Sequence, residues 1–246
     1  MNRLQSELHR LYLPRPQAHA GTDAQPSALI DASGSVRAMV MALTRPPDWE
    51  VLSRVWHGVQ AELELPAPAI AVSGTDGLQL WFSLAEPIAV AQAHAFLESL
   101  RLRFLCEVDA SRVHLMPAPD ASTPCHAALV PALQEETGNW SAFVAPDLAP
   151  VFADTPWLDI PPSEEGQATL LRGLATMKPA VFDAASKRLA PRAHQPAATA
   201  AVTTVAVMTG AAGEDPKRFL TQVMNDESVP LTLRIEAAKA LLQSSG

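Results

Sequence analysis

Cysteine and lysine are scarce in this sequence, and each shortage excludes a class of protein. The 246 residues include two cysteines, Cys106 and Cys125, which are too few for a disulfide framework and are expected to be reduced thiols. Only four of the 18 basic residues are lysine, and the net charge is −8. This balance argues against non-specific duplex binding, which depends on many Lys and Arg side chains that neutralise phosphates.

Long apolar runs and leader-like segments are also missing. No apolar run approaches the ~18 residues that a membrane span requires. The first residues, MNRLQSELHRLYLP, lack the basic-then-apolar order of a secretion signal. The histidines and cysteines show neither H-x-x-x-H nor C-x-x-C spacing, so no zinc site is expected. The sequence therefore predicts a cytoplasmic protein without membrane contact, metal or cofactor.

Apolar residues make up 48% of the chain, enough for a sizeable core, and 22 prolines outnumber 11 glycines. Proline clusters and shifts in composition divide the sequence into five segments. Residues 1–27 form an N-terminal arm with a short amphipathic stretch, and residues 28–145 form an α+β domain. Residues 146–190 hold a proline-rich linker and two helices, residues 191–213 are an Ala/Thr-rich connector or a weakly specified apolar helix, and residues 214–246 form a helical hairpin.

Strand and helix patterns alternate within the α+β domain. Apolar residues recur at helical spacing over residues 48–65 and 89–103, and Asp48 is suited to cap the first of these helices. This alternation with short connections predicts a small mixed or antiparallel sheet with two helices covering one face. Strands are expected at 36–43, 70–72, 78–84, 112–116 and 140–144, a hairpin at 28–43, and later helices at 163–177 and 179–189.

A Ser-Gly-x-x-Gly turn, residues 73–77, joins two of these strands. Such a turn brings backbone amides and short polar side chains to one edge of a sheet, where nucleotide-binding folds often place a phosphate. The same residues are equally typical of an ordinary strand connection. Ser73 does not lie in a nucleophile elbow, because that motif needs glycines where Ala71 and Thr75 stand.

Carboxylates and histidines near the expected sheet lack the pattern of a catalytic metal site. Glu107 and Asp109 lie two residues apart, but they precede a strand, where acids commonly form turns and caps. The strand 36–43 contains no acid. His114 is compatible with a structural or a catalytic role. The other acids near the expected sheet are Asp31, Asp76, Glu86 and Asp120.

Three motifs follow one another between residues 73 and 117: S-G-x-x-G-x-x-x-W, then F-x-L-x-E-P, and, after a helix, D-x-S-R-V-x-x-x-P. This succession resembles the core of the archaeo-eukaryotic primase-polymerases, especially the plasmid and phage types. The residues that fit the pattern are Ser73, Gly74, Gly77, Trp81, Glu86, Pro87, Asp109, Ser111, Arg112, Val113 and Pro117.

The resemblance implies an RNA-recognition-like half of a primase-polymerase fold that has lost metal-dependent chemistry. In that family a serine and then a histidine contact the nucleotide phosphates, and the histidine's position here holds Gln79. Leu115 and Met116 replace the family's second basic residue, and the family's acidic metal pair would lie on strand 36–43. The nucleotide- or phosphate-binding residues that the resemblance implies are Ser73, Gly74, Gly77, Gln79 and Arg112.

The sequence therefore favours a non-catalytic protein of bacterial replication or mobile elements that binds a nucleotide or single-stranded nucleic acid. The alternative is a protein–protein adaptor, because the C-terminal hairpin resembles helical segments of phage packaging and mobile-element proteins and also HEAT-type helix pairs. A third hypothesis is an active metal-dependent nucleotidyltransferase with acids gathered from distant segments. In the adaptor hypothesis the partner-binding residues are Phe219, Val223, Leu233 and Leu241.

Overall fold

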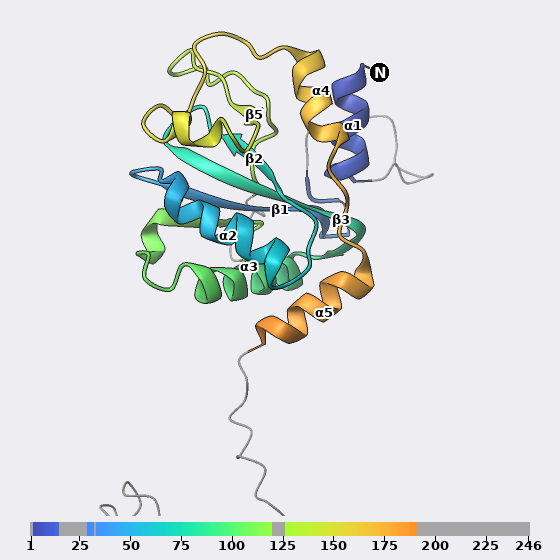
Figure 1. Cartoon of the computed structure of the whole chain (residues 1–246). Helices are drawn as coiled ribbons and strands as arrows, with labels where there is room; N and C mark the ends of the chain where they lie inside the picture. The colour runs from blue at the N-terminus through green and yellow to red at the C-terminus, as the bar shows by residue number, and fades with distance from the viewer. Residues whose placement is uncertain (1, 15–28, 32, 120–125, 191–246) are drawn as a thin grey trace, which may run out of the picture. The chain divides into compact units, whose positions relative to one another are not determined.

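A computed structural model describes residues 2–14, 29–31, 33–119 and 126–190. Within these ranges the chain forms an antiparallel five-stranded sheet with the strand order β4-β1-β3-β2-β5 (Figure 1). The predicted α+β class is confirmed. The strands are β1 (Ser35–Thr44), β2 (Ala69–Val72), β3 (Gly77–Ala89), β4 (Val113–Met116) and β5 (Ala142–Val144).

The helices lie close to the positions that the periodicity predicts. Asp48 caps the first domain helix as expected, its side chain accepting a hydrogen bond from the Val51 amide at 3.1 Å. The helix predicted at 163–177 ends earlier, at Arg172, because the chain then turns to pair Met177 with Leu84 of β3. The helices are α1 (Arg3–Leu11), α2 (Trp49–Ala61), α3 (Val90–Phe104), α4 (Glu164–Arg172) and α5 (Pro179–Leu189), with short 3₁₀ turns η1 (Ala110–Arg112) and η2 (Ala149–Phe152).

Helices α2 and α3 cover one face of the sheet, as predicted (Figure 1). Alternate residues of each strand point to this face and meet the apolar stripes of the two helices. Helix α5 extends this layer, where Phe182 packs on Phe96 with ring centroids 4.7 Å apart. The fully buried residues of this core include Met39, Met41, Leu43, Leu52, Val55, Val59, Leu78, Leu80, Leu97 and Leu100.

The second face of the sheet is covered as well, which the prediction of one covered face did not include. Helices α1 and α4 pack over it beside an aromatic cluster. Trp81 lies at the centre of this cluster, 5.2 Å from the Tyr12 ring and 5.8 Å from the Phe143 ring. Burial raises the pKa of the Tyr12 hydroxyl far above its ordinary value. A sheet covered on both faces explains why nearly the whole of β1 is buried.

Two buried polar side chains attach the helices of the second face to the sheet. A β-bulge between Val36 and Ala38 interrupts the alternation of β1, and the Arg37 guanidinium donates to four backbone carbonyls, those of His9, Arg10, Leu13 and Leu84. Three of these carbonyls lie at or just beyond the C-terminal end of α1, where a cation is favourable. From α4, the Gln167 amide pairs with the backbone N–H and C=O of Phe143 at 2.7 and 2.9 Å, as a further strand would.

Some of the sequence predictions concern residues that lie at the edges of the described ranges or outside them. Of the expected hairpin at 28–43, the described residues show a bridge between Ile30 and Val36, and residues 28 and 32 lie outside them. Cys106 is an exposed free thiol, whereas Cys125 lies outside the described residues. The predictions for residues 191–213 and 214–246 lie outside them too. In the described part of the chain, every helix is too short or too polar to cross a membrane.

Candidate ligand pocket on the sheet

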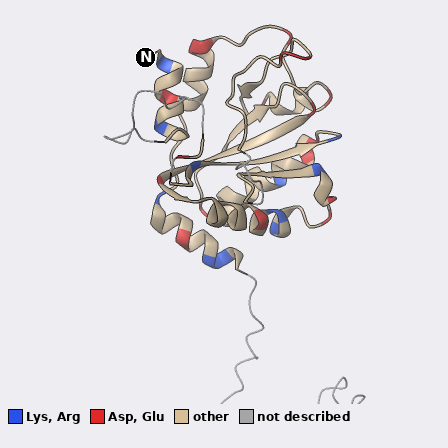
Figure 2. Cartoon of the chain, turned by 180° about the vertical axis from the view of Figure 1, so that it is seen from behind, with Lys and Arg blue, Asp and Glu red and all other residues tan. Residues whose placement is uncertain are grey.

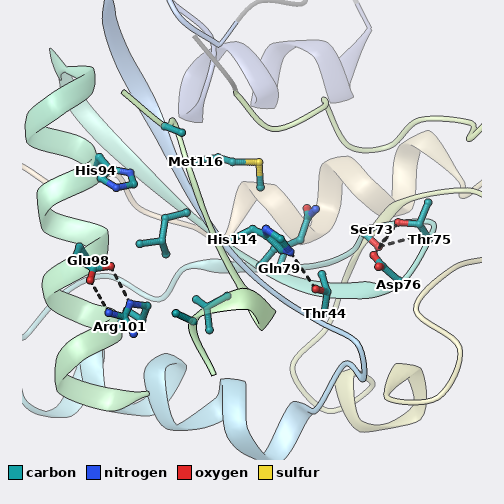
Figure 3. Close-up of a pocket in the computed structure, with 15 residues that line it drawn as sticks. Thr44, Ser73, Thr75, Asp76, Gln79, His94, Glu98, Arg101, His114 and Met116 are labelled. Carbon is teal, nitrogen blue, oxygen red and sulfur yellow. Dashed lines mark hydrogen bonds and ion pairs between the residues drawn. The ribbon is translucent and has the colours of Figure 1, made fainter. Parts of the chain in front are cut away.

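A pocket of about 540 Å³ opens between the 73–77 turn, the edge strand β4 and one side of α3 (Figure 3). Strands β1 and β3 form its floor, and α3 contributes one wall. The volume falls within the roughly 300–1,000 Å³ range of small-molecule sites. Its polar lining residues are Thr44, Ser73, Thr75, Asp76, Gln79, His94, Glu98, Arg101 and His114.

Sheet register places three pocket residues in one row across neighbouring strands. Ala42 of β1 lies opposite His114 of β4 on one side and opposite Gln79 of β3 on the other. Because side chains alternate between faces, this row shares its face with Trp81, two residues beyond Gln79. Ala42, in the middle of the row, has only a methyl side chain. The longer side chains of Gln79 and His114 therefore project further from the sheet on either side of it.

Gln79 has a fixed orientation in this row. The Trp81 indole Nε1–H donates to Gln79 Oε1 at 2.9 Å. An indole nitrogen can only donate, so the carbonyl oxygen of the amide must face Trp81 and the NH₂ group must face away. This NH₂ group forms no hydrogen bond with any residue that the structure describes. Gln79 therefore offers a donor to the half-buried floor of the pocket.

Both pocket histidines are held through one ring nitrogen. His94 Nδ1 lies 3.1 Å from the Pro117 carbonyl oxygen, which only accepts, so Nδ1 carries the proton. His114 Nε2 lies 3.1 Å from Thr44 Oγ1, and Thr44 in turn donates to the Arg112 carbonyl at 3.5 Å. This chain of contacts assigns the proton to His114 Nε2. In their neutral forms, both rings keep the other nitrogen as an acceptor.

The charged groups at the pocket are arranged in pairs. Arg101 donates through Nε and Nη2 to both carboxylate oxygens of Glu98, at 2.8 and 2.6 Å. These hydrogen bonds from Arg101 lower the pKa of Glu98 below its ordinary value. At the rim, Arg45 Nε lies 3.2 Å from Asp76 Oδ2. Acidic and basic residues are likewise interspersed along the described chain (Figure 2).

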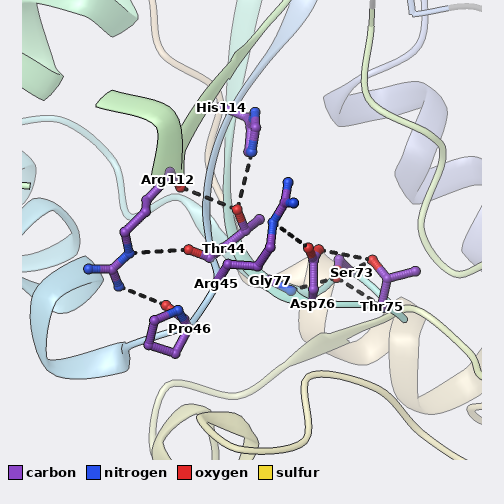
Figure 4. Close-up of polar contacts among 9 residues, drawn as sticks. All are labelled: Thr44, Arg45, Pro46, Ser73, Thr75, Asp76, Gly77, Arg112 and His114. Carbon is purple, nitrogen blue, oxygen red and sulfur yellow. Dashed lines mark hydrogen bonds and ion pairs between the residues drawn. The ribbon is translucent and has the colours of Figure 1, made fainter. Parts of the chain in front are cut away.

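The hydroxyl of Ser73 is fully engaged within the 73–77 turn (Figure 4). Its Oγ accepts from the amides of Thr75 and Gly77, at 3.1 and 2.9 Å. Thr75 Oγ1 donates to Asp76, so Ser73 Oγ–H is the donor in its 3.1 Å contact with Thr75 Oγ1. A hydroxyl has one proton and two lone pairs, and all three are in use.

The two turn glycines allow close approaches within the chain itself. Gly74 has φ +82°, and its amide donates to the Pro156 carbonyl at 3.0 Å. A Cβ on Gly74 would lie 2.8 Å from the Ser141 amide nitrogen, and one on Gly77 would lie 2.7 Å from Thr44 Cγ2. Both glycines are buried and shape the turn without lining the pocket.

Arg112 also lies outside the pocket lining. Its Nε donates to the Thr44 carbonyl at 3.3 Å and its Nη2 to the Pro46 carbonyl at 2.8 Å (Figure 4). The side chain therefore holds the loop after β1. Of the five residues that the resemblance assigns to nucleotide binding, the structure brings Ser73 and Gln79 to the pocket. The predicted partner-binding residues Phe219, Val223, Leu233 and Leu241 lie outside the described residues.

Sequence reasoning missed the wall that α3 contributes. His94, Glu98 and Arg101 recur at helical spacing, which places them on one side of α3 facing β4. This polar stripe was visible in the sequence as i, i+4 and i+7. Its approach to β4 depends on how α3 packs on the sheet edge, which spacing does not reveal.

Two of the acids near the sheet, Asp31 and Asp109, accept hydrogen bonds from neighbouring serines. Asp31 is partly buried, which raises its pKa, but hydrogen bonds from Ser33 and Ser35 outweigh burial and lower the pKa overall. Hydrogen bonds from Ser111 lower the pKa of Asp109 in the same way. Within the described ranges, no three His, Cys, Asp or Glu side chains are grouped to hold a metal ion. Asp120 lies outside those ranges.

Comparisons with known proteins give no assignment. No protein-family model matches the chain, and a search of the curated proteins finds no match either. The interpretation of the pocket therefore depends on its geometry and on the motifs in the sequence.

Proposed function

We propose that this protein binds a nucleotide or single-stranded nucleic acid in the sheet pocket and does not transform it. The observation that carries the proposal is the row of His114, Ala42 and Gln79. Ala42 forms the floor of the pocket, and the polar side chains of Gln79 and His114 stand on either side of it. Within this row, Gln79 stands where the primase-polymerase resemblance expects a histidine that contacts the nucleotide phosphates. We propose on the same grounds a relationship to primase-polymerases of bacterial replication or mobile elements.

The residues of β1 support a binding role without catalysis. In the primase-polymerases, this strand would carry the acidic pair that holds divalent cations. Here the side chains that β1 presents to the pocket are those of Ala42 and Thr44. Nucleotidyl transfer by two metal ions needs several carboxylates that converge on the cations. Neither residue supplies one.

The charge balance supports a short ligand or a single strand over a duplex. The net charge of −8 and the paired ions at the pocket provide little of the counterion release that drives duplex binding. Arg45, whose side chain is 73% exposed at the rim, is placed to meet a phosphate that projects from the pocket. Single-strand binding then depends on contacts to bases more than on a continuous basic groove.

Equilibrium binding by the full chain tests this proposal. The probes are fluorescently labelled single-stranded DNA and RNA oligonucleotides and the four ribonucleoside triphosphates, at low salt. Ala42→Met raises the pocket floor and is expected to abolish binding. Ala95→Met, the same substitution at an exposed position of α3 outside the pocket, is the matched control and is expected to bind normally.

Two results would contradict the proposal. The first is that the wild-type protein binds none of these probes at low salt. The second is that Ala42→Met, folded as judged by circular dichroism, binds as tightly as Ala95→Met. Either result would remove the pocket as a nucleotide site.

A further inference from the structure

We infer that the pocket holds the uncharged planar part of its ligand, the hydrogen-bonding edge of a nucleobase, and leaves phosphate outside. This inference rests on the proposed function and specifies which part of a nucleotide the pocket contacts. It follows from which hydrogen-bond donors and acceptors of the pocket have no partner within the described residues and can therefore bind a ligand.

The 73–77 turn has few donors left for a phosphate. The amides of Thr75 and Gly77 donate to Ser73 Oγ. The Ser73 amide donates to the Gly77 carbonyl and the Gly74 amide to Pro156. The Ser73 hydroxyl is saturated by its three hydrogen bonds within the turn. An anion could be bound here only if the turn opened and gave up these bonds.

The arginine side chains around the pocket already have partners as well. Arg101 is held by both oxygens of Glu98, and its side chain is only 16% exposed. Arg112 donates to two carbonyls and points away from the floor. Arg45 is engaged by Asp76 at the rim. No lining residue would offer an unpaired cation to a phosphate in the pocket, because the lining arginine, Arg101, is already paired with Glu98.

The groups that remain are complementary to a heterocycle. The Gln79 NH₂ group is a donor, and the His114 ring in its neutral form keeps one acceptor nitrogen, as does that of His94 on the α3 wall. Nucleobase edges carry both acceptors and N–H donors in the ring plane. A phosphate has acceptors only, so at neutral His it would match Gln79 alone.

The width of the row suits a single base. Gln79 and His114 lie on strands to either side of β1, so their backbones are about 10 Å apart, twice the spacing of neighbouring strands. A flat ring above Ala42 can accept from Gln79 at one edge and donate to His114 at the other. Met116, two residues along β4 on the same face, adds an apolar contact for the ring.

Titration calorimetry with the wild-type full chain separates base from phosphate. The probes are the four ribonucleosides, the matching triphosphates and inorganic tripolyphosphate. We expect at least one nucleoside to bind within about tenfold of its triphosphate, because most of the contact free energy comes from the base. Tripolyphosphate is expected not to displace either ligand.

The possible outcomes distinguish this inference from the proposed function. If triphosphates or oligonucleotides bind but no nucleoside does, or if tripolyphosphate displaces a bound triphosphate, the inference is overturned and the proposed function stands. If no nucleoside, triphosphate or oligonucleotide binds, both are overturned.

A single-atom change in Gln79 gives an independent test. In Gln79→Glu the carboxylate still accepts from Trp81, but an acceptor replaces the donor that faces the pocket. Nucleoside binding is expected to weaken by about 10- to 100-fold. Gln92→Glu, an equal charge change at an exposed position of α3 outside the lining, should bind like wild type. Unchanged nucleoside affinity in a folded Gln79→Glu protein would overturn the inference.

Discussion

Gly74 shows most clearly what a single residue contributes to the turn beside the pocket. Its φ of +82° is a left-handed conformation that costs other residues about 1–2 kcal/mol. A Cβ would also press on the backbone of Trp140 and Ser141, which has little freedom to move. We expect Gly74→Ala to lower the free energy of unfolding by about 3 kcal/mol, measured in urea.

Gly138 supplies a control with the same backbone conformation and no close neighbour. Its φ is +74°, and an added Cβ would meet nothing within 4 Å. Gly138→Ala should therefore cost only the left-handed penalty of about 1 kcal/mol. Equal destabilisation in the two variants would show that the contact between Gly74 and Ser141 is not tight.

At the same scale, the sequence motif predicts two residues that line the pocket but not the contacts that they make. Ser73 and Gln79 were found because the motif that contains them is contiguous in the chain. The partners of Ser73 are also local, yet their saturation of its hydroxyl is a matter of geometry that the motif does not encode. Arg112 fits the motif, but its guanidinium is turned toward carbonyls 66 and 68 residues away in sequence.

Among the secondary-structure elements, α3 has one side that could be predicted from the sequence, its apolar stripe in the core, and one that was not predicted, its polar side at the pocket. Its pocket side contains the Glu98–Arg101 pair, whose hydrogen bonds lower the pKa of Glu98. A carboxylate with a lowered folded-state pKa stabilises the fold above its unfolded pKa, about 4.3, and loses this contribution as the pH falls through the folded value. Glu98 is 38% exposed, so the contribution should be only about 0.5 kcal/mol.

We therefore expect Glu98→Gln to unfold at a lower temperature than wild type at pH 7 and at the same temperature near pH 3. The measurement is thermal unfolding followed by circular dichroism across this range. Glu136→Gln, at an exposed loop position, is the matched control and should show no such convergence. A stability difference that persists unchanged at pH 3 would mean that the lost charge of Glu98 is not the cause.

The helices and strands themselves were largely predictable because their signals are local. The stripes of α2 and α3 have the period of a helix, and Asp48 marks the start of α2. The end of α4 was not predictable, because residues 173–178 leave the helix to pair Met177 with β3 far away in sequence. The strand predicted at 140–144 is shorter, beginning at Ala142, since Trp140 instead bridges to Leu133 and Leu158.

For the described part of the molecule, the second helical layer is the feature that sequence reasoning could not supply. It is built by α1 and α4, which lie about 160 residues apart in sequence and have no local signal for each other. Only the continuous apolar character of β1 indicated that both faces of the sheet need a cover. Ala42, Gln79 and His114 line the pocket from this face, whereas the lining residues of α3 belong to the helix layer on the other face, beside the edge strand β4.

Arg37 of β1 hydrogen-bonds the C-terminal end of α1, so replacing it tests whether these hydrogen bonds are needed to keep the second helical layer packed on the sheet. The guanidinium is 4% exposed and donates to carbonyls at the end of α1 and on β3. In Arg37→Met these buried carbonyls lose their donors, which we expect to cost about 3 kcal/mol or more. Hydrogen exchange should show lost protection in α1 while the β1–β3 pairing stays protected, because the α2–α3 core does not depend on Arg37.

Arg54→Met, an equal loss of charge on the exposed side of α2, is the matched control and should leave both α1 and the β1–β3 pairing protected. Equal protection of α1 and β1 in the Arg37 variant would mean that apolar packing alone, through Leu4, Leu8 and Leu11, holds the second layer in place.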